Sequence, residues 1–370
     1  MYHPFVVMDA WAKSRKPGRA SRAEAVLNRM NDLAILTGNK LLLPDKFSYT
    51  CLLNAIINDK KNGFIEKCEE IIQTMEAGDH RIKPDVFAYN YLIKVYSSAQ
   101  MPEKAEDVIS RIENAGLEPS NVCYNNLMSA YAKSRTPGSA EHVTRIFEKM
   151  ETKSSLTPDI KSYVMCLDAL ARCQRASREQ TAEALANRYI QFAKRNQLLA
   201  SSAPIFHSLQ TVYVHSDSFD KAKKSLGVIK LMEENGIQPG VRAYNGVIRA
   251  CSHLPLNAEL ETKKVAVEMA ARVLHVLQSG IDLSPDSSSY NDLVSVCKLI
   301  TDPEEKHQTV HAIFKKCCDD GLLNRNILAT LKHVAGRQFW ALVGKNRGHV
   351  DVTSLDPSWS RNVRISPRRV

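Results

Sequence analysis

Apolar residues recur along the chain in short runs that have the spacing of helices. Ala105, Val108, Ile109 and Ile112 follow one another at i, i+3, i+4 and i+7. This spacing places all four side chains on one face of an amphipathic helix, with charged residues on the other face. Similar runs fill most of the sequence and are separated by breaks rich in proline and glycine. The pattern predicts many short helices and favours an all-α fold.

A longer phrase repeats in phase with these runs, namely a proline, a tyrosine five residues later, and then a short apolar helix. A degenerate copy without the proline spans Phe206–Tyr213, and an incomplete first copy spans Val7–Ser14. From Tyr49 onward the ring-to-ring spacings are 40, 35, 39, 43, 38 and 46 residues, counted through Phe206, which is the length of a two-helix repeat. The six full copies are Pro44–Tyr49, Pro84–Tyr89, Pro119–Tyr124, Pro158–Tyr163, Pro239–Tyr244 and Pro285–Tyr290.

Each repeat also carries start and stop signals. The proline ends the preceding helix and fixes an extended entry to the next. Gly116 and Gly236 stand three residues before a proline, where glycine supplies a left-handed helix cap. One helix pair cannot bury its own apolar face, so neighbouring pairs must stack. We therefore expect an α-solenoid superhelix of stacked helix-turn-helix repeats over residues 1–325, with a capping helix over 326–342 and a basic tail ending at residue 370.

The repeated phrases resemble those of a known family. Tyr89-Asn-Tyr-Leu-Ile93, Lys104-Ala-Glu106 and Gly116-Leu-Glu-Pro119 are similar to the marks of P-type pentatricopeptide repeat proteins, and residues 86–120 fit the family's 35-residue unit without insertion. The resemblance covers about eight units. Three of them, which begin near residues 1, 46 and 121, carry three extra residues between their helices, and the longest unit spans 241–286. Three residues make nearly one helical turn, so we expect the helices there to lengthen.

The resemblance implies that each unit reads one unpaired RNA base with two side chains, the residue after the tyrosine and the residue after the closing proline. The implied target is 5′-G-C-U-N-N-U-3′, read in the parallel direction. Taken unit by unit, Thr50 with Asp85 resembles a guanine reader, Asn90 with Ser120 a cytosine reader, and both Asn125 with Asp159 and Asn245 with Asp286 uracil readers.

The remaining units give no clear reader. Val164 pairs with Ser202 and His207 with Gly240, and neither pair indicates a base. In the eighth unit Asn291 has its partner position at Arg325, and in the first unit Phe5 stands with Asp45. An asparagine or aspartate at these places can equally well cap a helix, so the alternative for every pair is a structural role.

Three apolar residues precede their tyrosine by two positions, namely Phe47, Phe87 and Val122. The resemblance implies that they wedge between bases, which suits stacking on an apolar surface. For Phe47 and Phe87 the alternative is a place in the core between repeats.

Charge and cysteine content limit the partners and the compartment. The chain has 50 Lys+Arg and 40 Asp+Glu, a net charge of +10. Residues 332–370 hold eight basic and two acidic side chains, which is a net charge of +6. The first 331 residues therefore carry a net charge of only +4. The body is nearly balanced, so charge alone does not argue for a polyanion. Nine cysteines, an odd number, indicate a reducing compartment and core positions, including the adjacent Cys317 and Cys318. No apolar run reaches the roughly 18 residues of a membrane span.

Little in the sequence points to catalysis. There is no glycine-rich phosphate loop, and the 45 residues after residue 325 are too few for an independent enzyme domain. His307 and His311 stand one helical turn apart, a metal-ligand spacing, but no third ligand accompanies them. We expect no enzyme activity, no metal and no cofactor.

The leading hypothesis is a monomeric, sequence-selective binder of single-stranded RNA that acts in RNA processing, stability or translation. The resemblance implies localisation in a mitochondrion or a plastid. A helical pattern begins almost at Met1, so we expect the native N-terminus to lie upstream. One alternative is a scaffold, similar to tetratricopeptide arrays, that holds a peptide or a partner helix. Another is a fragment of a larger enzyme.

Overall fold

The computed structural model describes residues 4–14, 16–59, 62–134, 136–173, 177–280, 282–344 and 350–363, and every regular element in these ranges is a helix. The chain divides into two compact units, Met1–Ala169 and Leu170–Val370. The first unit contains α1 (Pro4–Lys13), α2 (Arg19–Thr37), α3 (Lys46–Asp59), α4 (Phe64–Ala77), α5 (Val86–Ser98), α6 (Pro102–Asn114), α7 (Asn121–Ser134), α8 (Ser139–Thr152) and most of α9 (Ile160–Arg172).

The second unit continues the same alternation of helices. It contains α10 (Arg178–Arg195), α11 (Ala203–His215), α12 (Lys221–Glu234), α13 (Val241–Ser252), α14 (Leu260–Ser279), α15 (Ser287–Val296), α16 (Pro303–Asp319), α17 (Arg325–Ala335) and α18 (Phe339–Leu342). Short 3-10 turns follow α2, α10, α15 and α17, and two more lie at Val352–Ser354 and Pro357–Ser360.

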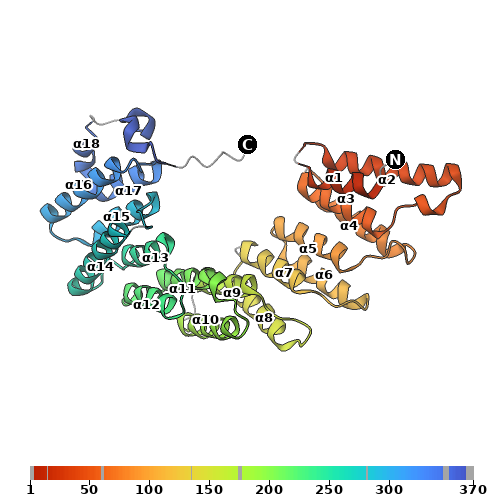
Figure 1. The fold of residues 1–370 in the computed structure, drawn as a ribbon, viewed down its shortest axis with the longest axis horizontal. Helices are drawn as coiled ribbons and strands as arrows, with labels where there is room; N and C mark the ends of the chain where they lie inside the picture. Colours follow the sequence, from red (N-terminus) through yellow and green to blue (C-terminus); the bar gives the residue numbers. More distant parts are fainter. Residues whose placement is uncertain are drawn as a thin grey trace. The chain divides into compact units, whose positions relative to one another are not determined.

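Helix packing within each unit follows one rule, which Figure 1 shows. In the first unit α5 packs against α3 and α7, the corresponding helices of the neighbouring pairs, and also against α4 and α6. In the second unit α13 packs in the same way against α11, α15, α12 and α14. The first helices of the pairs thus form one layer and the second helices another. The expected all-α solenoid of stacked helix pairs is confirmed.

The predicted stop and start signals lie where the helices end and begin. Gly116 and Gly236 have φ angles of 71° and 72°, the left-handed conformation that glycine adopts without strain, and they follow α6 and α12. Where an aspartate follows the closing proline, it caps the next helix; Asp85 Oδ1, for example, accepts the N–H of Ala88 at 3.0 Å. These local interactions fix where each first helix begins.

In the units that begin near residues 46 and 121 the three extra residues do not lengthen the first helix as expected. α3 and α7 have 14 residues, against 13 in α5, which has no insertion. The extra residues lie in the turn instead, because Gly18, Gly63 and Gly138 each precede a second helix with φ of 76°, 75° and 81°. Glycine permits this tight left-handed entry, so the insertion is absorbed without rotating the helix.

A hydrogen-bonded charge network joins the second helices of the first unit. Arg111 on α6 donates to Glu69 at 2.6 Å and to Glu76 at 2.9 Å, and both glutamates lie on α4. The hydroxyls of Tyr89 and Tyr96 donate to the same two carboxylates, each at 2.8 Å. Partial burial opposes ionisation of Glu76, but the hydrogen bonds from Arg111 and Tyr89 hold its pKa below the usual value.

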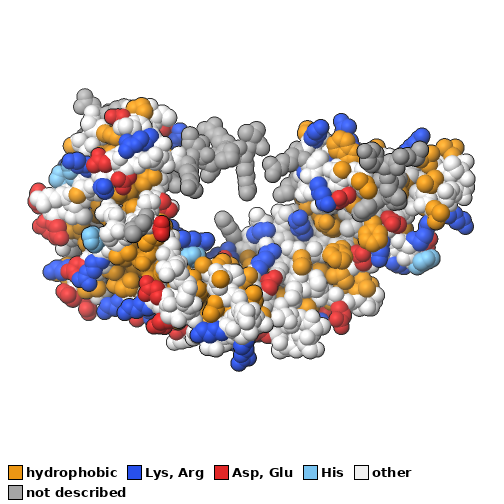
Figure 2. Space-filling view, in the orientation of Figure 1, with side chains coloured by type: hydrophobic (Ala, Val, Ile, Leu, Met, Phe, Trp, Pro, Cys, Tyr) orange, Lys and Arg blue, Asp and Glu red, His pale blue; other side chains and the backbone are white. Residues whose placement is uncertain are grey.

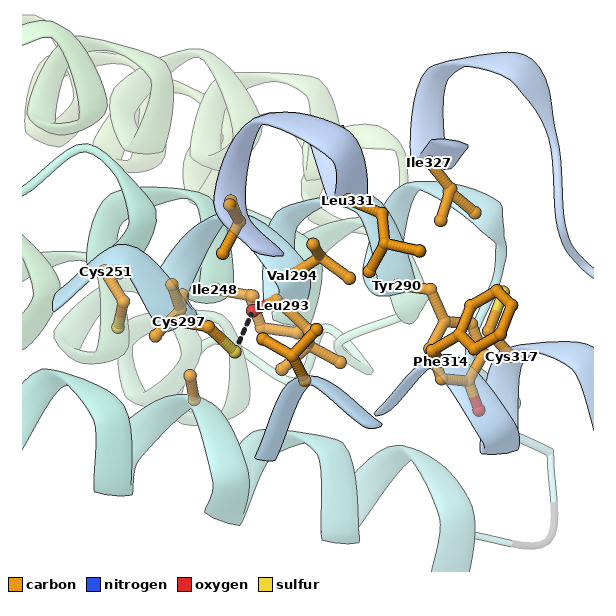
Figure 3. Close-up of a cluster of buried hydrophobic side chains, with 14 of the residues drawn as sticks. Ile248, Cys251, Tyr290, Leu293, Val294, Cys297, Phe314, Cys317, Ile327 and Leu331 are labelled. Carbon is orange, nitrogen blue, oxygen red and sulfur yellow. Dashed lines mark hydrogen bonds between the residues drawn. The ribbon is translucent and has the colours of Figure 1, made fainter. Parts of the chain in front are cut away.

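The core of the second unit lies between α13, α15, α16 and α17, as Figure 3 shows. Tyr290 is fully buried there, and Leu293 and Ile327 pack with it. Cys297 donates its thiol to the carbonyl of Leu293 at 3.5 Å. All nine cysteines are buried, Cys317 and Cys318 among them, which confirms their predicted place in the core.

The C-terminal segment differs from the expected capping helix. Gly336, with φ of 56°, ends α17, and α18 begins at Phe339, so one continuous helix over 326–342 is wrong. Part of the expected tail is folded, because the carbonyl of Trp359 accepts the N–H of Leu323 at 2.8 Å and the Trp359 ring packs edge-on against Phe314. Five basic residues of the tail lie outside the described residues: Lys345, Arg347, Arg364, Arg368 and Arg369. The division at residue 325 stays a prediction.

Candidate nucleic-acid interface

The two members of each predicted reader pair come from consecutive first helices. Asn125 lies in the first turns of α7, and its partner Asp159 immediately precedes α9. Asn245 on α13 and Asp286 immediately before α15 have the same relation in the second unit. Helix stacking, rather than sequence proximity, therefore brings each pair together.

Asn125 and Asp159 are in direct contact. The amide nitrogen of Asn125 donates to Asp159 Oδ1 at 3.2 Å, and the amide oxygen accepts the hydroxyl of Ser162 at 2.7 Å. Asp159 Oδ1 also accepts the N–H of Ser162 at 2.9 Å, as a helix cap. Asn125 is only 2% exposed, whereas the Asp159 carboxylate is exposed. The predicted reader pair and the helix cap therefore share one network of hydrogen bonds.

Asn245 and Asp286 form the same network in the second unit. The Asn245 amide nitrogen donates to Asp286 Oδ1 at 3.0 Å, and its oxygen accepts the Ser289 hydroxyl at 2.6 Å. Asn245 is 5% exposed, and Ser289 is fully buried. The same three residue types thus recur at the same helix positions in the two compact units.

The other two predicted pairs are held differently. The Thr50 hydroxyl donates to the carbonyl of Lys46 in its own helix at 2.7 Å, while Asp85 caps α5. The Asn90 amide oxygen accepts from the amide nitrogen of Asn126 at 2.9 Å, and the Ser120 hydroxyl lies 3.4 Å from the sulfur of Cys123. All four of these predicted readers are partly exposed.

The three predicted stacking residues project from the surface. Phe47 is 53% exposed, Phe87 72% and Val122 52%, and each lies at the start of a first helix, two residues before the tyrosine. A place in the core between repeats is therefore wrong for Phe47 and Phe87. Exposed aromatic side chains at regular intervals suit stacking of bases, and that role stays a prediction.

A cavity of about 360 Å³ opens in the second unit between α11, α13 and α15. Asn245 and Asp286 lie in its wall, together with His207, whose own pair indicated no base, and with Arg242 at the position of the stacking residues. Burial, and then the nearby Arg242 charge, lowers the pKa of His207, which favours a neutral imidazole at pH 7. Asn245, although mostly buried, thus lies in the wall of a cavity.

The eighth unit has a partner residue that the sequence analysis misplaced. The residue that caps α17, and so matches Asp85 and Asp286, is Asn324, whose side-chain oxygen accepts the N–H of Ile327 at 2.9 Å. Arg325 is the first residue of the helix, and its assignment as the partner of Asn291 is wrong. The missing closing proline removed the landmark from which that position was counted.

No group of three or more His, Cys, Asp or Glu side chains suited to a metal occurs in the described part of the chain, where His307 and His311 lie on α16. None of the helices described is both long and apolar enough to cross a membrane. Figure 2 shows basic side chains interspersed with acidic ones over the visible face of each unit, as the near-balanced charge predicts.

Comparisons with known proteins agree with the fold. Residues 84–133 match the model of the PPR repeat family, and residues 39–99 and 109–172 match that of the pentatricopeptide repeat domain. A chloroplastic pentatricopeptide repeat-containing protein of Arabidopsis thaliana is 25% identical over 263 residues, which is 69% of this chain and 31% of that protein. The chain thus spans about a third of the length of this relative.

Two solved structures share the fold. They are crystal structures of the pentatricopeptide repeat protein PPR10, one with three cysteine-to-serine substitutions, and each holds an 18-nucleotide psaJ RNA element. Each matches this chain with a TM-score of 0.65 and 18% sequence identity. Each match covers 92% of this chain and 44% of the PPR10 chain. The stacked pairs and bridging side chains define a helical-repeat protein. The matching family models show that residues 39–172 of the chain consist of pentatricopeptide repeats.

Proposed function

We propose that the protein binds single-stranded RNA and selects its sequence base by base. The observation that carries the proposal is the recurrence of one bridging network, Asn125 with Asp159 and Asn245 with Asp286, at the positions of the predicted readers. The exposed Phe47 and Phe87 add a stacking surface beside the readers. PPR10, which shares the fold, is bound to RNA in its crystal structures.

The chemistry of the bridging pair fits uracil. Uracil presents a carbonyl oxygen next to an N–H group, whereas cytosine presents an amino group next to an unprotonated ring nitrogen. An amide N–H beside a carboxylate offers a donor and an acceptor in the order that uracil requires. In the third unit Ser120 replaces the aspartate, and its hydroxyl is able to donate to the ring nitrogen of cytosine. The proposed target is therefore 5′-G-C-U-N-N-U-3′.

We place this binding in an organelle, where it acts on RNA processing, stability or translation without catalysing a reaction. The chloroplastic relative supports an organelle, and the choice between mitochondrion and plastid follows only from identification of the bound transcript. Binding of the RNA backbone adds a contribution that falls with salt, because counterions are released when phosphates are contacted.

A second candidate is a scaffold for a protein partner. It is favoured by exposed apolar side chains that no reader role explains, Ile35, Leu36 and Leu41, which are 78%, 76% and 93% exposed. It predicts that a bound peptide, rather than RNA, covers apolar surface of the first unit. The two candidates differ in whether base sequence changes the affinity.

The test measures binding of fluorescent RNA by anisotropy. The target 5′-GCUAAU-3′, flanked by adenosines, is compared with a scrambled RNA of the same composition at several salt concentrations. We expect the target to bind at least about tenfold more tightly, since each correct hydrogen bond contributes about 1 kcal/mol. Equal affinity for both RNAs would refute base reading.

A matched pair of variants separates reading from folding. Asn125→Ala removes a predicted reader, and Val164→Ala changes the corresponding position of the next unit, where no reader is predicted. We expect only Asn125→Ala to weaken binding of the target while binding of the scrambled RNA stays the same. Loss of binding to both RNAs in both variants would instead indicate a purely structural role.

A further inference from the structure

The amide oxygens of four asparagines at the reader position are all occupied by protein donors. In each case the asparagine follows the ring residue of its unit, and the donor lies on the next first helix of the same folded unit. Asn125 accepts from Ser162 and Asn245 from Ser289, at 2.7 and 2.6 Å. The remaining two contacts are Asn126 to Asn90 at 2.9 Å and Thr330 to Asn291 at 2.8 Å.

The donors occupy two positions of the following helix. Ser162 and Ser289 stand three residues after the capping aspartate, in the first turn of α9 and α15. Asn126 and Thr330 stand six residues after the capping residues Ser120 and Asn324, one turn farther along the helix. Both positions reach the same end of the preceding asparagine amide, although they differ in residue type and distance along the helix.

The aspartate fixes which way round the amide lies. Asp286 accepts from the amide nitrogen of Asn245 at 3.0 Å, and an amide rotated by half a turn would place its oxygen against this carboxylate. The serine hydroxyl donates to the other end. Serine and aspartate together therefore permit a single orientation of the amide.

This orientation determines what the amide can offer to a base. An amide nitrogen carries two hydrogens, and the carboxylate takes one of them, which leaves the other for a ligand. The serine hydroxyl takes one of the two acceptor sites of the oxygen and holds that end of the amide away from the carboxylate, so the group that the amide offers to the base is the remaining N–H. A base carbonyl oxygen satisfies that donor, whereas the amino group of cytosine opposes it.

We propose that Ser162 and Ser289 are positioning residues that set the base preference of the preceding unit. The proposal rests on the proposed function, because it specifies how that site discriminates among bases. It extends these two reading units from two side chains to three.

Ser48 provides a natural control for this role. It is buried at the same position of α3, and its hydroxyl donates to the capping Asp45 at 2.8 Å, as a helix cap alone requires. The reader position of the preceding unit is occupied by Phe5, whose side chain has no amide group. Ser48 and Ser289 thus share the cap, and only Ser289 also holds a reader.

The experiment measures the uracil-to-cytosine preference at the last nucleotide of 5′-GCUAAU-3′ for the full chain and for Ser289→Ala, Ser289→Thr and Ser48→Ala. We expect Ser289→Ala to lower the preference by about fivefold, the effect of one hydrogen bond. Ser289→Thr keeps the hydroxyl and should retain the preference, and Ser48→Ala should leave it unchanged. Thermal unfolding of each variant accompanies the measurement, and Ser162→Ala tests the third nucleotide independently.

The outcomes separate this inference from the proposed function. If the unmodified chain prefers uracil and both Ser289→Ala and Ser162→Ala keep that preference, the positioning role is wrong and RNA reading stands. A loss of preference in Ser48→Ala equal to that in Ser289→Ala overturns the role as well, because the cap alone would then explain it. If the unmodified chain shows no preference at either uracil, base reading fails and the inference falls with it.

Discussion

Replacement of Asn245 by threonine tests whether the reader pair determines the base. The substitution turns the pair Asn245–Asp286 into threonine with aspartate, the same combination as Thr50–Asp85 in the second unit. We predict that Asn245→Thr changes the preference at the sixth nucleotide of the target from uracil to guanine.

The structure indicates a large effect on binding and a small effect on stability. The variant loses the hydrogen bond from Asn245 to Asp286 and the acceptor of the Ser289 hydroxyl. That buried hydroxyl is not left unpaired, because Asp286 Oδ1 lies 3.1 Å away and can accept it. The free energy of unfolding should therefore fall by only about 1 kcal/mol. Loss of the amide donor should weaken uracil binding by about tenfold.

The assay compares four RNAs that differ only in the base at the sixth nucleotide, by anisotropy at constant salt. Val164→Thr serves as the control, since it introduces the same side chain at the reader position of the fifth unit and should leave the sixth nucleotide unaffected. If Asn245→Thr binds with the uracil preference of the unmodified chain, or if Val164→Thr causes the same change, assignment of this nucleotide to Asn245 is wrong.

Three further predictions concern the stability of the fold. Arg111→Met should lower the free energy of unfolding at pH 7 by about 2 kcal/mol, because Glu69 and Glu76 lose their cation; this figure is reduced for the 25% exposure of Arg111. Urea unfolding measures the change, and an unchanged free energy of unfolding would show that the network is only a surface contact. The pKa of Glu76 is lowered in the folded state, because its hydrogen bonds outweigh the effect of partial burial. The contribution of Glu76 to the stability of the fold is therefore present above the unfolded pKa of about 4.3 and is lost as the pH falls through the folded pKa. The difference between Arg111→Met and the unmodified chain should therefore shrink below about pH 4, and a constant difference down to pH 3 would contradict this assignment. Gly236→Ala should lower the free energy of unfolding by about 1 kcal/mol, because a φ of 72° strains any side chain although the surrounding space is open. Thermal unfolding measures this change, and an unchanged melting temperature would argue against a left-handed cap.

The fold was largely predictable because its signals are local. A proline at Pro84, a ring at Tyr89 and a glycine at Gly116 define the ends of a helix pair from neighbouring residues alone. The turn that absorbs three extra residues at Gly63 was not predicted, since helix extension and a glycine turn suit the same number of residues. The fold of residues 350–363 onto α16 depends on contacts such as Trp359 with Phe314, which no local pattern reveals.

The candidate site was predicted less completely. Repetition located Asn125 and Asp159, but the sequence showed neither their contact nor the burial of Asn125, since both arise from stacking of helices far apart in the chain. Ser162 and Ser289 were missed, although a serine four residues after the closing proline recurs in the sequence and is a usable signal. Asn324 was missed because no proline marks it.

Selection from a random pool of single-stranded RNA tests the central claim most directly. The chain is bound to the pool, the retained RNAs are sequenced, and the enriched motif is compared with that retained by Asn125→Ala. We predict enrichment of G-C-U followed after two unspecified nucleotides by U, with the third position alone becoming degenerate in the variant. Retained RNAs without a common motif, or a motif that Asn125→Ala leaves intact, would contradict the account.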